Sequence, residues 1–272
     1  MRGAVIGMVT VLLAASVEST AAQEGQWTRF RGPNAGVVAD DPRLPEVWSE
    51  TENVVWMTDI PGLGWSSPVV WDDHIFVTTA ISSGEERTPR PGLYDPGADY
   101  GATRSSASHR WLVYDLDFST GAVRWVRELG LAVPGIERHI KNSFASETPV
   151  TDGERLYVYF GTIGLVAALE LDGEVAWTRE LGVYNGRQRF GTAASPALHD
   201  DRLYVVNDNT TQSFLVAFEA SSGEEVWRVE RDEVENWSSP FIWENELRTE
   251  IVTAGRRQIR SYDLNGELLW EL

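Results

Sequence analysis

Short runs of mostly hydrophobic residues, bounded by polar positions, recur along the chain after its N-terminal segment. Runs such as RLYVYF, RLYVVN and FLVAFEA are rich in Val, Leu, Tyr and Phe, and Gly, Pro, Asn or Asp residues stand between them. Short runs of this composition favour β-strands over helices. No amphipathic helical pattern follows the N-terminal segment. The pattern therefore predicts an all-β chain.

A Gly residue stands four positions before a Trp residue in four segments, TGAVRW, DGEVAW, SGEEVW and NGELLW. The tryptophans of these segments are Trp125, Trp177, Trp227 and Trp270. A proline opens each unit, and these prolines are Pro68, Pro149, Pro196 and Pro240. Between proline and tryptophan, each unit has room for three short strands and a tight turn at the Gly, because Gly tolerates positive φ. Each unit is therefore read as four strands.

Four-stranded units that recur about every 45 residues are typical of a β-propeller. We expect about four blades, as part of an eight-bladed ring. The predicted blade domain is 62–272, and its blades are 62–129, 141–181, 189–230 and 236–272. The repeated Trp lies on the predicted outer strand of each blade, where it can dock on the neighbouring blade. Burial of such an aromatic side chain contributes about 1.5–3 kcal/mol.

The N-terminus has the pattern of a secretory signal peptide, 1–22, with Arg2, an apolar run and small residues before the expected cleavage site at Ala22. The apolar run is too short to span a bilayer, and no Cys follows it for lipid attachment. We therefore expect a periplasmic or secreted protein without a stable membrane anchor.

The segment 23–61 precedes the blades, and Trp56 stands twelve residues before Pro68. This is close to the thirteen residues that separate Trp227 from Pro240. We therefore expect an outer closing strand near Trp56. Because the last unit already has its own Trp strand, the sequence is interpreted as a fragment of a larger ring.

The segments YDLDFSTGAVRW, LELDGEVAW, FEASSGEEVW and YDLNGELLW resemble the tryptophan-docking motif of quinoprotein-type propellers, the PQQ-like repeat. The resemblance covers about 26–272, and WTRFRGPNAGVV is similar to the opening segment of secreted bacterial members. The family includes PQQ-dependent alcohol or sugar dehydrogenases and the scaffold lipoprotein of outer-membrane protein assembly. The motif specifies architecture better than function.

Dehydrogenases of this family typically hold the quinone against a disulfide of adjacent Cys residues and bind calcium through carboxylate and amide groups. This chain has no Cys, and no position-by-position match to the calcium ligands is found. Catalytic and cofactor-binding residues therefore remain unknown, and no cofactor is predicted. PQQ with Ca²⁺ belongs to the alternative hypothesis of an oxidoreductase or a remnant of one.

The formal net charge of −18 argues against nucleic-acid binding, which requires clusters of Lys and Arg. Candidate binding residues come from two regions. A long loop in the first unit, rich in Gly, Pro, Ser and Arg, contributes Arg87, Arg90, Tyr94, Asp95, Asp99, Tyr100, Arg104 and His109. The segments before the second and third blades contribute His139, Lys141, Asn142, Arg187, Gln188 and Arg189, which we expect to face the central channel.

Two other features are assigned structural roles. DLDFSTG, from Asp115 to Gly121, lacks the Gly position and the final Glu of an EF-hand loop and is interpreted as a turn. The four His residues lack metal-ligand spacing and are expected at solvated turns or loops, so no metal site is predicted.

The leading functional hypothesis is an exported, non-catalytic propeller that serves as a binding or scaffold module for an envelope or extracellular protein, peptide or glycan. The alternatives are a PQQ-dependent oxidoreductase and a scaffold for outer-membrane protein assembly.

Overall fold

The computed structural model describes residues 26–33, 35–37, 41–85 and 101–272. The predicted signal peptide and residues 86–100 of the long loop lie outside the described residues. No helix in the described ranges has the length and apolar character needed to cross a membrane.

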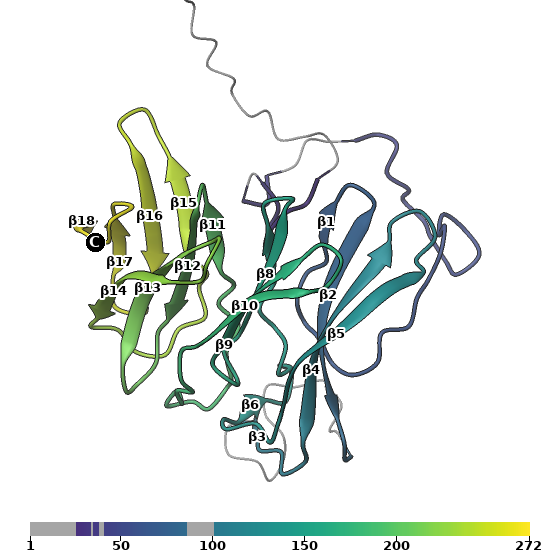
Figure 1. The fold of residues 1–272 in the computed structure, drawn as a ribbon, viewed down its shortest axis with the longest axis horizontal. Helices are drawn as coiled ribbons and strands as arrows, with labels where there is room; N and C mark the ends of the chain where they lie inside the picture. The colour runs from purple at the N-terminus through teal and green to yellow at the C-terminus, as the bar shows by residue number, and fades with distance from the viewer. Residues whose placement is uncertain (1–25, 34, 38–40, 86–100) are drawn as a thin grey trace, which may run out of the picture.

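Four antiparallel sheets of four strands each make up the described chain, as predicted (Figure 1). Blade 1 contains β1 (Val69–Trp71), β2 (His74–Ser82), β4 (His109–Asp117) and β5 (Val123–Ala132). Blade 2 contains β7 (Val150–Thr151), β8 (Arg155–Phe160), β9 (Leu165–Glu170) and β10 (Val175–Glu180). Blade 3 contains β11 (Ala197–His199), β12 (Arg202–Asn207), β13 (Ser213–Glu219) and β14 (Glu225–Arg231). Blade 4 contains β15 (Phe241–Glu244), β16 (Thr249–Ala254), β17 (Ile259–Tyr262) and β18 (Leu268–Glu271).

The blades follow one another around an arc, so the described residues form an all-β propeller arc of four blades (Figure 1). One small sheet was not predicted. It pairs β3 (Ala102–Thr103), at the end of the long loop, with β6 (Arg138–His139), in the segment before blade 2. This pairing ties the insertion of blade 1 to the entrance of blade 2.

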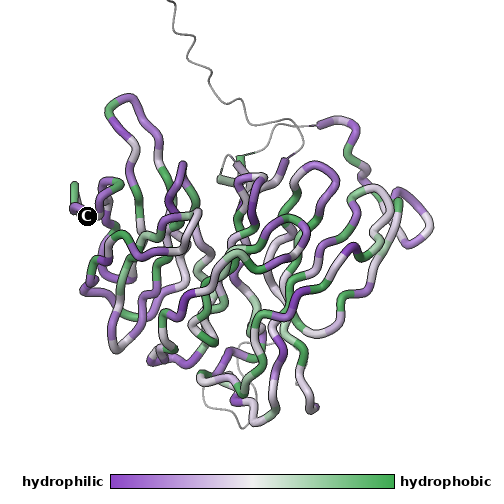
Figure 2. Tube along the Cα trace, viewed as in Figure 1, coloured by the Kyte–Doolittle hydropathy of each residue, from purple (hydrophilic) through white to green (hydrophobic). Residues whose placement is uncertain are grey.

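Among the described residues the hydrophobic core consists of three clusters, one between each pair of neighbouring blades. Alternate residues of one strand serve different clusters, because successive side chains point to opposite faces of a sheet. On β8, Leu156 and Val158 pack toward blade 1, whereas Tyr157 and Tyr159 pack toward blade 3. Figure 2 shows hydrophobic positions concentrated along the strands and hydrophilic positions in many of the turns.

In the first three units the repeated tryptophan docks on the turn of the next blade, whereas the prediction covered all four units. The indole Nε1 of Trp125 donates to Leu171 O at 2.9 Å, that of Trp177 to Ala220 O at 2.8 Å, and that of Trp227 to Leu264 O at 3.0 Å. Each indole also covers the Gly of that turn. At Gly173, where φ is +86°, an added Cβ would lie 2.7 Å from Trp125. The Gly–Trp repeat is therefore an inter-blade contact.

Trp56 occupies the same kind of docking site. The outer strand expected near it is not formed, and residues 54–60 contain no strand. Its Nε1 donates to Phe118 O at 2.9 Å, and its ring lies against Gly121 of blade 1. Trp270 differs from the other repeat tryptophans. It has no following turn to dock on among the described residues, and its Nε1 donates to Glu250 Oε2 of its own blade at 2.7 Å.

The segments that open the blades are linked by side-chain hydroxyls at the residue before each proline. Ser67 N donates to Thr148 Oγ1, Thr148 N to Ser195 Oγ, and Ser195 N to Ser239 Oγ, each at 2.9 Å. These three hydrogen bonds, the hydroxyl belt, satisfy backbone N–H groups that take no part in strand pairing. The hydroxyl belt also fixes the spacing of the first strands, which lie next to one another along the inner side of the arc.

Candidate functional site

The predicted binding loop is only partly described. Arg87, Arg90, Tyr94, Asp95, Asp99 and Tyr100 lie outside the described residues. Arg104 and His109 are described and have different surroundings. Arg104 is exposed and its guanidinium lies 3.2 Å from Glu137 Oε1, whereas His109 is buried.

The predicted channel residues gather where the chain enters blades 2 and 3. Asn142 Nδ2 donates to Phe190 O at 2.9 Å, and the His139 ring packs edge-on against Phe190 with 4.7 Å between ring centroids. Gln188 N donates to Glu235 Oε2 at 2.7 Å. Lys141 and Arg187 are exposed. The structure thus brings part of the predicted set together through packing and backbone contacts.

Glu137 joins the two predicted groups, although the sequence analysis did not select it. Its carboxylate is nearly buried, and its Oε1 lies 3.2 Å from the Arg104 guanidinium and 3.5 Å from the Arg189 guanidinium. A carboxylate held between two arginines from separate segments ties the insertion to the entrance of blade 3. Glu137 begins the ERHIK segment, so its charge is visible in the sequence, but its pairing with Arg104 depends on the β3–β6 contact.

The expectation that every His sits at a solvated turn or loop is wrong for His109. It lies on β4 with 1% exposure, its Nδ1 is 3.0 Å from Ala107 O, and its ring packs edge-on against Phe144. His74 also lies on a strand, and its Nδ1 is 2.8 Å from the buried Asp115. β2 and β4 are nine residues long and pair up to Ser82 and His109, so His109 lies at the start of a strand and not in the insertion.

The DLDFSTG segment forms a turn, as interpreted from the sequence. Asp117 Oδ1 accepts hydrogen bonds from Ser119 N at 3.1 Å and from Thr120 N at 2.9 Å, and both hydroxyls also donate to it. These donors, together with Arg124, hold the pKa of Asp117 well below its ordinary value. The carboxylate thus stabilises the turn on which Trp56 docks.

Glu147 is a buried carboxyl group that the sequence analysis missed. It stands two residues before Pro149 at 1% exposure, a position at which blades 1 and 4 have Ser and blade 3 has Ala. Gly161 N donates to its Oε1 at 3.2 Å, and Ser146 N donates to its Oε2 at 3.3 Å. Burial raises the pKa of Glu147 to about 7 in spite of these donors.

The pKa of Glu147 makes stability depend on pH. Because the folded pKa lies above the unfolded value of 4.5, the stabilising contribution is complete below pH 4.5 and is lost as pH rises through 7. We expect the loss to approach about 3 kcal/mol. The Glu147→Gln variant should lose this dependence, as measured by urea unfolding at pH 5 and pH 8, whereas the exposed control Glu154→Gln should retain it. An unchanged pH dependence in Glu147→Gln would contradict this assignment.

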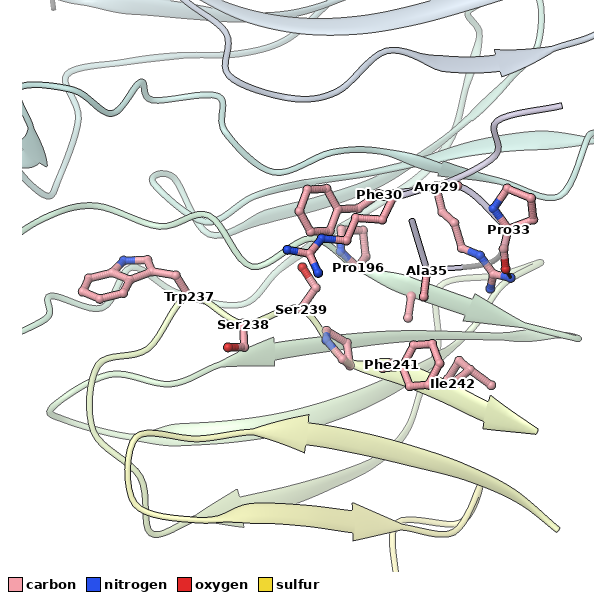
Figure 3. Close-up of a pocket in the computed structure, with 14 residues that line it drawn as sticks. Arg29, Phe30, Pro33, Ala35, Pro196, Trp237, Ser238, Ser239, Phe241 and Ile242 are labelled. Carbon is pink, nitrogen blue, oxygen red and sulfur yellow. Dashed lines mark hydrogen bonds between the residues drawn. The ribbon is translucent and has the colours of Figure 1, made fainter. Parts of the chain in front are cut away.

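A pocket of about 500 Å³ lies on the inner side of the arc, between the N-terminal segment and the first strands of blades 3 and 4 (Figure 3). Phe30, Pro33 and Ala35 form one side, and Pro196, Phe241 and Ile242 contribute to the other. A volume of this size is typical of small-molecule and side-chain binding sites. The sequence analysis did not predict this pocket.

The N-terminal segment reaches the pocket along the inner edges of blades 1 and 2. Trp27 N donates to Val70 O at 3.0 Å, Val70 N donates to Trp27 O at 2.8 Å, and Thr151 N donates to Thr28 O at 3.0 Å. A turn follows, in which Gly32 N donates to Arg29 O at 2.9 Å. The WTRFRGP segment therefore spans two blades and presents its two arginines at the other two.

A calcium–quinone centre of the kind found in the dehydrogenases needs several oxygen ligands close together. In the described part of the chain, no group of three or more His, Asp or Glu side chains is placed to hold a metal ion. These residues do not fit such a centre, so no catalytic step is derived from them.

The model of the family described as "Outer membrane protein assembly factor BamB" matches residues 95–208 and 162–272. Similar solved structures include the quinohemoprotein alcohol dehydrogenase ADHIIG from Pseudomonas putida HK5, at 14% identity, with 79% of this chain and 34% of that chain covered and a TM-score of 0.47. The quinohemoprotein alcohol dehydrogenase from Comamonas testosteroni has 15% identity, with coverages of 78% and 35% and a TM-score of 0.49.

BamB from Moraxella catarrhalis has 16% identity, with 79% of this chain and 87% of that chain covered and a TM-score of 0.24. The chain spans about a third of the length of the two dehydrogenases. No curated protein sequence matches it significantly. The family matches together span residues 95–272 of the 272-residue chain, more than half of it. The chain therefore belongs to the PQQ-like propeller family whose model is described as outer membrane protein assembly factor BamB.

Proposed function

We propose that this protein is an exported, non-catalytic binding or scaffold module of the bacterial envelope. The observation that carries the proposal is the pocket on the inner side of the arc, where the N-terminal segment meets blades 3 and 4. Its walls are apolar and its polar groups are arginine and serine side chains, a composition suited to holding part of a partner protein. The expected signal peptide, 1–22, supports export.

The family match favours one form of this function. A family described as an outer membrane protein assembly factor supports a role in which the blades bind an envelope protein during its assembly. In this role the propeller supplies rigid binding surfaces and needs no cofactor.

Crosslinking in intact cells tests the proposed function. A tagged protein with its own leader is exported, treated with formaldehyde and purified under denaturing conditions. We expect discrete adducts with envelope proteins. Recovery of the exported protein without any adduct would contradict the proposal.

Reconstitution with PQQ and CaCl₂ tests the oxidoreductase alternative. Quinone absorbance and dye-linked oxidation of alcohols and sugars are measured on the purified protein. The proposed function predicts neither saturable quinone binding nor turnover. Binding of one quinone per chain together with dye reduction would replace the proposal with the alternative.

A further inference from the structure

The pocket of Figure 3 differs in charge from the chain as a whole. The chain carries 41 acidic and 23 basic residues, whereas the described residues that line the pocket include two arginines and no Asp or Glu. The two arginines are Arg29 and Arg31 of the N-terminal turn. An electropositive pocket in an acidic protein is complementary to an anionic ligand.

The two arginines are held differently. The Arg29 guanidinium donates to Pro33 O at 2.9 Å, and burial lowers its pKa while the charge of Glu244 opposes this effect. The Arg31 guanidinium lies 5.3 Å from the centroid of the Phe30 ring and forms no ion pair with another described residue. Arg29 therefore shapes the turn, and Arg31 has its donors available for a ligand.

The turn that carries Arg31 is fixed in shape. Arg31 has a φ of +64°, a left-handed conformation that is uncommon for residues other than Gly, and Gly32 follows at +69°. Gly32 is buried beneath Trp27, where an added Cβ would lie 2.7 Å from the indole ring. The backbone turn that presents Arg31 therefore has its shape before any ligand arrives.

Exposed apolar surface lies beside Arg31 in the pocket. Phe30 is 39% exposed and Phe241 is 47% exposed, and both line the pocket together with Ile242 (Figure 3). Aromatic residues, including Phe, and Arg are enriched at protein interfaces. The ligand should therefore combine a negative charge with an apolar or aromatic group.

We propose that this pocket binds an acidic peptide segment of a partner protein. One Asp or Glu carboxylate of the segment pairs with the Arg31 guanidinium, and a neighbouring aromatic or branched side chain packs between Phe30 and the wall formed by Phe241 and Ile242. The proposal rests on the function proposed above and names the chemistry of the partner at one site.

Isothermal titration of the purified protein with the peptide acetyl-Gly-Asp-Phe-Asp-Gly-amide tests the site. We expect saturable binding that weakens with added salt. Arg31→Gln and the peptide with Asn in place of both Asp should each weaken binding at least about tenfold, the change expected from loss of a charge-assisted hydrogen bond. The matched control is Arg256→Gln, an exposed arginine in the turn between β16 and β17, which should bind as the wild type does.

Equal binding of the Asp and Asn peptides, equal binding by Arg31→Gln, or no binding by the wild-type protein would overturn the inference. Circular dichroism of Arg31→Gln shows whether the fold is retained, and Phe241→Ala provides a second variant that leaves the turn unchanged. The titration measures peptide binding at the pocket alone, whereas crosslinking in cells tests the proposed function through adducts with envelope proteins. Adducts without peptide binding therefore reject the inference and retain the function, and peptide binding without adducts does the reverse.

Discussion

Replacement of Trp177 by Ala is expected to lower the free energy of unfolding by about 3–5 kcal/mol, the range found for large aromatic side chains removed from a core. Trp177 is 7% exposed and packs between Tyr157 of its own blade and Phe218 of blade 3. Its Nε1 also donates to Ala220 O at 2.8 Å. The substitution thus leaves a cavity between two blades and an unpaired carbonyl group, and urea unfolding followed by circular dichroism measures the loss.

Trp243 is the matched control for this prediction. It lies on β15, is 43% exposed, and belongs to none of the three inter-blade clusters. Trp243→Ala should lower the free energy of unfolding clearly less than Trp177→Ala does, although both changes remove an indole. Equal losses would mean that docking on the next blade is not what makes the repeated tryptophan important.

Replacement of Asp208 by Ala is expected to lower the free energy of unfolding by a similar amount, about 3–5 kcal/mol, because it leaves a buried arginine without its counter-ion. Asp208 and Arg231 form an ion pair of 2.8 Å, with side-chain exposures of 2% and 0%. Burial opposes the charge of Arg231, but its hydrogen bond and ion pair with Asp208 hold its pKa above the ordinary value. Arg231 also donates to Thr253 Oγ1 and Tyr262 Oη, so the pair joins blades 3 and 4.

The exposed pair of Asp232 and Arg257 provides the comparison. Its side chains are 86% and 51% exposed, so solvent screens the interaction. Asp232→Ala should change the free energy of unfolding by less than about 1 kcal/mol. If Asp208→Ala were as mild as Asp232→Ala, the buried network would not be a main link between blades 3 and 4.

The architecture was predictable because the signal recurs. Gly and Trp keep one spacing in four units, and the chain needs positive φ at the Gly and an indole above it at each junction, as at Gly173 and Trp125. The residues before the prolines carried a further signal that was not used. Ser67, Thr148 and Ser195 occupy one position in successive units, and their hydroxyl belt is a consequence of that repetition.

The candidate site was harder to predict because it depends on contacts between segments that do not repeat. The sequence places WTRFRGP in the segment that precedes the blades, and only its pairing with Val70 and Thr151 brings Arg31 to β15. Glu147 was missed because a single acidic residue in a small-residue motif gives no sign of its burial. His109 was misplaced because β4 begins at His109, so the loop ends before it.

Site-specific photocrosslinking in intact cells tests the central claim, that the inner pocket is a partner-binding site. Benzoylphenylalanine is introduced at Phe241 in the pocket and, as a matched control, at Phe118 in the outer turn of blade 1, which is 52% exposed. We predict a discrete adduct with an envelope protein from position 241, reduced by Arg31→Gln, and none from position 118. An adduct from position 118 alone, or no adduct from position 241 in the correctly exported protein, would contradict this account.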